Sequence, residues 1–282
     1  MLVDINRYHT MWIQSGKPIN EQVSDEMVKD FLIQIKQGED IDGTAKEMEN
    51  LQEGFKHLRG ELMKLSDKEQ KNYVGELDVE TCVQECHRVL MKDLLDETRT
   101  QPGRFSVLPR SANFDGNDYL YPTYATEEIA YQAVDTLILE YNKMVRQISH
   151  YNHDLKIERL IKCASVFLFG FLSIHPFSDG NGRLARLLCS HCLAVFCPFQ
   201  TSIHNSFSHS ARSDYVRAIV NDRQPISAYQ IQYKEDAVKE TGLVLEQSPI
   251  ELCSVVIESN WFTWRQFLHK IGEPISLFDF EK

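Results

Sequence analysis

A short segment near the middle of the sequence combines the residue types that phosphate chemistry needs. It reads His175-Pro176-Phe177-Ser178-Asp179-Gly180-Asn181-Gly182-Arg183-Leu184-Ala185-Arg186. Gly180 and Gly182 allow the backbone to turn where a side chain would block it. Successive N–H groups can then face an anion at the start of the next helix. We therefore interpret the segment as an anion-binding loop.

The ionisable side chains of this loop predict contacts to phosphate, to a metal and to a reacting hydroxyl. Arg183 and Arg186 are three residues apart on a predicted helix, so they share a face and can fork onto phosphate oxygens. Asp179 offers a hard oxygen ligand for Mg²⁺, which would bridge two phosphates. A neutral imidazole at His175 can accept a proton from an attacking hydroxyl near neutral pH.

Two further loop residues have expected structural roles, and a second motif serves as a comparison. Asn181 can hydrogen-bond a phosphate or fix the loop, and Phe177 is expected to point inward as an apolar anchor. The sequence repeats Asp-Gly-Asn at 115–117 without a nearby histidine, a second glycine or paired arginines. We interpret that copy as a hairpin turn.

The segment 175–186 resembles the signature of the Fic (Fic/Doc) family, His-x-Phe-x-Asp/Glu-Gly-Asn-Gly-Arg-x-x-Arg, and matches it at every fixed position. Residues 87–90 and 102–105 are similar to the helix and the segment that lead into the family's flap, a hairpin that aligns the target side chain. Residues 212–215 are similar to a later helix that helps to form the nucleotide pocket. The resemblance covers about 72–225.

The resemblance implies a mainly helical fold and transfer of AMP from ATP to Ser, Thr or Tyr hydroxyls of a target protein, itself included, with release of pyrophosphate. It makes His175 the general base and Asp179 the ligand of Mg²⁺. The implied phosphate-binding residues are Gly180, Asn181, Gly182, Arg183 and Arg186. Aspartate at 179 favours AMP transfer over the kinase-like and phosphocholine-transferring branches, which usually differ there.

Two residues outside the loop are candidates for contacts to the base or ribose. These are Tyr215 and Asn221, for which helix packing and a surface amide are the alternative interpretations.

Many members of the family carry an inhibitory helix with the pattern Ser/Thr-x-x-x-Glu-Gly/Asn. Glu49-Asn50 matches the end of this pattern, but Ala45 stands four residues before Glu49, and Thr44 is one residue out of register. We hypothesise that Glu49 reaches Arg186 and competes with phosphate. The alternative is an exposed helical carboxylate.

Two other functions remain open at this point. One is removal of AMP from a modified protein by the same site, with a glutamate orienting water. The other is a nucleotide-binding or target-binding module without turnover.

The elements that must position the loop are predicted from apolar periodicity. Helices are expected over 157–174 before the loop and 183–196 after it, and over 126–149 with Thr126 as N-cap. An Asp-Gly turn predicts a hairpin within 104–124. The other predicted helices span 21–37, 44–65, 77–95, 209–222 and 251–271, with polar connections at 199–207 and 223–236. The fold class is mainly α, a helical bundle with a small β-hairpin flap.

The chain is expected to divide into an N-terminal helical region at 1–71 that includes the candidate inhibitory helix, a catalytic core at 72–225 and a C-terminal helical flank at 226–282.

Composition narrows the partners. The 282 residues include 30 basic and 41 acidic side chains, a net charge of -11. This balance argues against binding nucleic acid. The most apolar run, 164–174, is too short for a membrane span. No secretory signal is visible at the start, and the seven cysteines show no disulfide framework, so we expect a cytoplasmic protein. The expected partners are ATP and a protein with a hydroxyl side chain, with no nucleic acid and no membrane, and a homodimer is left open.

Overall fold

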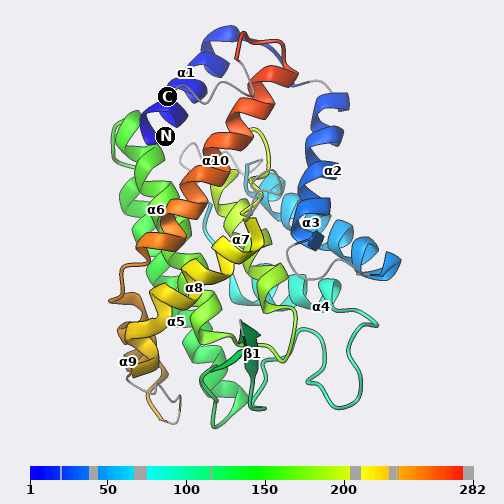
Figure 1. Cartoon of the computed structure of the whole chain (residues 1–282), viewed down its shortest axis with the longest axis vertical. Helices are drawn as coiled ribbons and strands as arrows, with labels where there is room; N and C mark the ends of the chain where they lie inside the picture. Colours follow the sequence, from blue (N-terminus) through cyan, green and yellow to red (C-terminus); the bar gives the residue numbers. More distant parts are fainter. Residues whose placement is uncertain are drawn as a thin grey trace.

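Helices dominate the architecture, and a two-stranded antiparallel sheet projects at one end (Figure 1). The computed structural model describes residues 1–275 apart from 20, 38–43, 67–74, 115, 204–210, 229–232 and 234. These elements confirm the predicted fold class, mainly α with a small hairpin.

The helical segments follow one another along the whole described chain. They are α1 Leu2–Ser15, α2 Glu21–Gln37, α3 Ala45–Ser66, the π-helical η1 Val79–Glu85, α4 Cys86–Leu90, α5 Glu127–Ile148, α6 His153–Ile174, α7 Asn181–Leu193, α8 Ala211–Ala228, α9 Ala237–Leu245 and α10 Ile250–Lys270. The strands are β1 Ser111–Phe114 and β2 Asn117–Leu120, which pair from Ser111 with Leu120 to Phe114 with Asn117.

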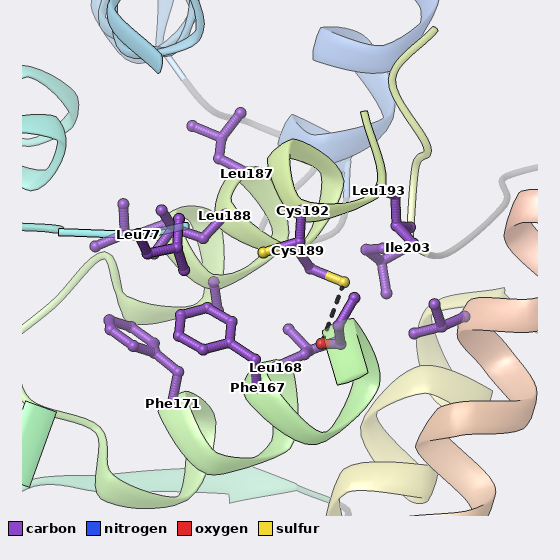
Figure 2. Close-up of a cluster of buried hydrophobic side chains, with 14 of the residues drawn as sticks. Leu77, Phe167, Leu168, Phe171, Leu187, Leu188, Cys189, Cys192, Leu193 and Ile203 are labelled. Carbon is purple, nitrogen blue, oxygen red and sulfur yellow. Dashed lines mark hydrogen bonds between the residues drawn. The ribbon is translucent and has the colours of Figure 1, made fainter. Parts of the chain in front are cut away.

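The core of the bundle lies where α6 packs between α5 and α7. Figure 2 shows the contact of α6 with α7, where Phe167 and Phe171 meet Leu188 and Cys192. Each large apolar side chain buried in this way contributes about 1.5–3 kcal/mol. Because α6 is buried along most of its length, its C-terminal end holds the loop that follows in a defined place.

Local sequence explains where the central helices begin. The Thr126 hydroxyl accepts a hydrogen bond from the Ile129 N–H at 3.2 Å and starts α5. Glu127 and Glu128 stand in the first turn, where the helix dipole favours negative charge. At the start of α6, the Asn152 side chain accepts from the Leu155 N–H at 3.1 Å.

The outer helices cover two sides of this core. α10 packs on α8 and α6, and α1 packs on α10 (Figure 1). On the other side α2 and α3 pack on α7, and α3 also contacts α4. Within the described ranges, no helix has both the length and the apolarity required to cross a bilayer.

The structure differs from the sequence prediction at four places. The helix predicted over 77–95 is η1 followed by the short α4, which ends at Leu90, and Asp93 beyond it has a φ of 61°. α8 continues through Pro225 to Ala228, although 223–236 was predicted to be a connection. Helices α1 and α9 were not predicted. Packing of α8 and α1 on α10 stabilises these helices, and this tertiary contribution cannot be predicted from the polarity of their own residues.

Candidate functional site

The loop between α6 and α7 begins with an unusual backbone conformation. His175 caps α6 with a φ of 47°, in the left-handed region, and its N–H donates to the Phe171 carbonyl at 2.9 Å. Few residues other than glycine adopt this conformation. The Tyr124 hydroxyl donates to the carbonyl of Ile174, the last residue of α6. The chain therefore leaves the helix in a direction that the surrounding structure holds.

Gly180 caps the other end of the loop, and its glycine is required. Its φ is 73°, and a Cβ built on it would lie 2.5 Å from Met91 Sδ and 3.3 Å from His87 Nε2. α7 then begins at Asn181 with its first N–H groups lacking acceptors within the helix. A helix start of this kind can accept an anion, so its geometry fits the prediction made from the sequence pattern.

Two buried side chains hold the inside of the loop. Asn181, 1% exposed, accepts from the Phe177 N–H at 2.9 Å and donates to the Phe177 carbonyl at 2.8 Å. Of its two expected roles, the structure gives it the fixing of the loop. Phe177 is fully buried and stacks on the His87 ring, with centroids 3.6 Å apart and an interplanar angle of 5°.

Three backbone carbonyls of the loop are held by α4 and by the segment that leads from it into the hairpin. The hydrogen bonds join the Ser106 N–H to the Pro176 carbonyl at 2.8 Å, Arg99 Nη1 to the Ser178 carbonyl at 3.2 Å, and His87 Nε2 to the Asp179 carbonyl at 3.0 Å. Because the Gly103 N–H donates to His87 Nδ1 at 2.9 Å, the proton of this neutral imidazole lies on Nε2. Burial lowers the pKa of His87 to about 4, so this tautomer persists at neutral pH. The loop is thus preorganised.

A cavity of about 540 Å³ opens in front of the loop, a volume suited to a small-molecule ligand. The loop, the hairpin and α8 form its walls. Its charge is opposite to that of the whole chain, because five arginines and one carboxylate, Asp179, are among its lining residues in the described part of the chain. The arginines are Arg99, Arg110, Arg186, Arg212 and Arg223. The local charge therefore favours anions over cations in this cavity.

His175 lines the cavity as a neutral imidazole. Its ring stacks on Tyr121 with centroids 3.5 Å apart and an interplanar angle of 11°. Burial holds the pKa of His175 well below its usual value, and the positive charges of Arg223 and Arg110 lower it further. A neutral imidazole can accept a proton, which is what a general base requires.

The two motif arginines have different surroundings. Arg186 is 2% exposed, lines the cavity, and donates from Nη2 to the Ile35 carbonyl of α2 at 3.1 Å. Its guanidinium lies 5.8 Å from the ring centroid of Tyr215, which is 3% exposed and also lines the cavity. Arg183 is absent from the lining and binds Glu47 at 3.1 Å. Both arginines were expected from the sequence to face one ligand, and in this structure Arg186 lines the cavity whereas Arg183 does not.

The α3 carboxylate that contacts a motif arginine is Glu47, and the expected contact of Glu49 with Arg186 is wrong. Glu49 is 65% exposed and pairs with Lys46 at 3.2 Å. Glu47 and Glu49 are two residues apart on α3, so at about 100° per residue they face nearly opposite sides. Glu47 also accepts from the Thr44 N–H at 2.6 Å, while its own N–H donates to Thr44 Oγ1 at 3.2 Å, a capping box.

Asn221 does not contact the cavity, so its nucleotide-pocket assignment is wrong. Its amide donates to Glu251 of α10 at 2.9 and 3.1 Å. Tyr215 lies six residues earlier on α8, which places the two side chains on different faces of a helix with about 3.6 residues per turn.

Asp179 fits a magnesium ion that is held by one protein carboxylate and otherwise by substrate phosphates and water. Its side chain is 50% exposed and lines the cavity, and Oδ1 accepts from the Gly180 N–H at 2.6 Å. In the described ranges, no group of three or more His, Cys, Asp or Glu side chains could hold a metal. Mg²⁺ commonly binds through one carboxylate together with substrate phosphates and water. The carboxylate here matches that pattern.

Sequence reasoning missed several residues of the cavity, notably Tyr121, Arg110 and Arg223. The Tyr121 N–H donates to the Arg110 carbonyl at 3.0 Å, directly after the paired strands. The sequence did offer a signal for Arg110 and Tyr121, because they flank the predicted hairpin. Arg223 gave no signal, because its segment was predicted to be a connection.

Comparisons with known proteins agree with the loop signature. The family model described as Fic/DOC family matches residues 76–193. A curated protein, the ribonucleoside-diphosphate reductase small chain of Ostreid herpesvirus 1, is 32% identical over 154 residues. The match covers 53% of this chain but only 23% of that protein, and the reductase name describes that protein as a whole.

Solved structures share the fold over nearly the whole chain. A Fic domain containing signaling protein from Bacteroides thetaiotaomicron VPI-5482 superposes with a TM-score of 0.64 at 18% identity, covering 98% of this chain and 99% of that one. Fic-1 (aa134–508) from C. elegans gives 0.57 at 15% identity, covering 96% and 71%. At these identities the likeness establishes the fold.

Proposed function

We propose that the chain is a protein adenylyltransferase that moves AMP from ATP to hydroxyl side chains of proteins, its own included, and the match of the Fic/DOC family model to residues 76–193 supports this. The observation that carries the proposal is one cavity that joins a neutral imidazole, a helix start and several arginines. In a chain with a net charge of -11, such a cavity suits a polyphosphate.

The phosphates of ATP would bind at the start of α7. The N–H groups there and the Arg186 guanidinium offer donors on one side of the cavity, while Asn181 keeps the loop from rearranging. A Mg²⁺ bound by Asp179 and phosphate oxygens would offset negative charge on the departing pyrophosphate.

The reaction would follow from His175. Its neutral imidazole takes the proton of the acceptor hydroxyl while that oxygen attacks the α-phosphorus. The new bond joins the acceptor oxygen to the α-phosphorus. The bond from that phosphorus to the oxygen bridging to the β-phosphate breaks, and pyrophosphate leaves with the electron pair.

The hairpin is the expected place for the acceptor segment. Residues of β1 and Tyr119 of β2 line the cavity, and most residues of both strands are exposed. An extended peptide can pair with an exposed strand edge through its backbone. This arrangement would present a Ser, Thr or Tyr hydroxyl to His175 without requiring a particular neighbouring sequence.

The test is incubation of the full chain with Mg²⁺ and ATP labelled separately on the α- and γ-phosphates. Label from the α-phosphate on wild-type protein, lost in His175→Ala, supports AMP transfer. Label from the γ-phosphate indicates a kinase and contradicts the proposal. ATP binding by both proteins without label from either position indicates a binding module, which also contradicts it.

A further inference from the structure

Three side chains from separate elements form a stack at the reacting side of the cavity. The His175 ring at the end of α6 covers one face of Tyr121 at 3.5 Å. The guanidinium of Arg223 on α8 lies 4.4 Å from the Tyr121 centroid. Because the imidazole already occupies one face at van der Waals distance, the guanidinium lies on the other. All three residues line the cavity.

The middle member of the stack is held by its backbone as well as by Arg223. Tyr121 follows β2, and its N–H donates to the Arg110 carbonyl at 3.0 Å, which closes the base of the hairpin. The Arg110 guanidinium donates to the Ser106 carbonyl and to the carbonyl of Pro122, the residue after Tyr121. Arg223 also hydrogen-bonds the Tyr121 side chain. The aromatic ring therefore has little freedom to move.

The imidazole of His175 needs such a support. Its ring nitrogen Nδ1 lies 3.4 Å from the Leu172 carbonyl, which is at the long limit of a hydrogen bond. With its own proton on Nδ1, the imidazole can take up the proton of the attacking hydroxyl at Nε2. A long hydrogen bond alone fixes the ring plane weakly, whereas a parallel aromatic ring at contact distance permits few orientations.

We propose that Tyr121 is a positioning residue for His175, and that Arg223 keeps Tyr121 in place so that the imidazole stays aimed into the cavity. The proposal rests on the AMP-transfer function proposed above, in which His175 is the base. Misplacing a reacting group by about 1 Å can cost roughly 100-fold in rate. The stack accordingly contributes to turnover more than to nucleotide binding.

Arg223 has a second effect, because its positive charge also lowers the pKa of His175. The charged groups that lower the pKa of His175 are Arg223 from α8 and Arg110 from the segment before β1, after the larger effect of burial. Removing the charge with Arg223→Met raises the pKa of His175 and moves the acidic limb of the pH–rate profile to higher pH. Arg223→Lys keeps the charge and leaves that limb in place.

The geometric part is tested without turnover, by NMR of the His175 ring in the full chain. Stacking on Tyr121 shifts the His175 ring protons upfield. Tyr121→Phe keeps this shift, and Tyr121→Ala removes it. The matched control Tyr119→Ala, from the neighbouring strand position that also lines the cavity, leaves it unchanged. An unchanged shift in a folded Tyr121→Ala protein overturns the proposal.

The functional part is tested by steady-state transfer of α-labelled AMP. Tyr121→Ala is expected to lower kcat by about 10- to 100-fold with little change in the Kd of ATP, and Tyr121→Phe to recover most of it. Equal kcat values for wild type and Tyr121→Ala overturn the positioning role while leaving the AMP-transfer function intact. If wild type itself transfers no AMP, the proposed function fails, and the NMR comparison still decides whether Tyr121 orients His175.

Discussion

At the scale of single residues, the partner of Arg183 distinguishes the observed site from the one expected. A motif arginine was expected to contact phosphate, and Glu47 of α3 holds its guanidinium at 3.1 Å, with the arginine side chain 12% exposed. Asp179 lies on the same arginine at 3.9 Å. Two carboxylates near one guanidinium mean that a phosphate must compete for it.

Glu47→Gln is therefore predicted to tighten binding of ATP by about three- to tenfold, because the neutral amide holds Arg183 less strongly than a carboxylate does. Titration calorimetry with ATP measures the change. Glu49→Gln is the matched control on the same helix, since Glu49 contacts Lys46 and is expected to leave affinity unchanged. A larger effect at Glu49 than at Glu47 would restore the original assignment of the inhibitory residue.

At the scale of elements, the junction of the loop with α7 depends on a close approach to α4. Gly180 has a positive φ, and a Cβ there would meet Met91 Sδ at 2.5 Å. Met91 is 1% exposed, so its side chain would have to shift within the packed interior to make room. Gly116 of the hairpin turn has a similar φ of 76°, but no atom lies within 4 Å of an added Cβ.

This pair separates backbone strain from steric crowding. Gly116→Ala is predicted to cost about 1–2 kcal/mol of unfolding free energy from its φ alone. Gly180→Ala adds about 1–3 kcal/mol because the added methyl group overpacks the contact with Met91. Urea unfolding of the two variants measures the difference. Equal losses would show that the approach of α4 to the loop is loose.

At the scale of the whole molecule, neutral histidines are buried in two of the helices that frame the site. Burial lowers the pKa of His87 in α4 to about 4 and that of His191 in α7 to about 4. In the unfolded chain both bind protons below about pH 6.5. Between these two pH values the unfolded state holds more protons, so stability rises with pH in this window.

Acidification from about pH 6.5 to about pH 4 is therefore predicted to lower the unfolding free energy by on the order of 3 kcal/mol for each of these histidines. Urea unfolding across this range measures the slope. His191→Gln is expected to reduce the slope, whereas His269→Gln, at an exposed position of α10, leaves it unchanged. A slope that is the same in both variants would contradict the assignment to His191.

Much of this protein was predictable from the sequence, because the signals were local. The glycines and polar residues of 175–186 stand at fixed spacing. The Thr126 cap and the apolar periods of α2, α3 and α5 depend on neighbours a few residues away. The hairpin around Gly116 follows from turn chemistry in the same way. Such features require no knowledge of which element packs on which.

The tertiary structure alone decided which side chains meet in and around the site. Tyr121 comes to His175, Arg223 to Tyr121, and Glu47 to Arg183 from segments far apart in the chain, and no periodicity relates them. Pairings of this kind depend on how helices pack in three dimensions. A rotation of α3 by about 100°, the angle of one residue, would place a different side chain against Arg183. Local pattern thus determined the loop at 175–186, and packing determined what surrounds it.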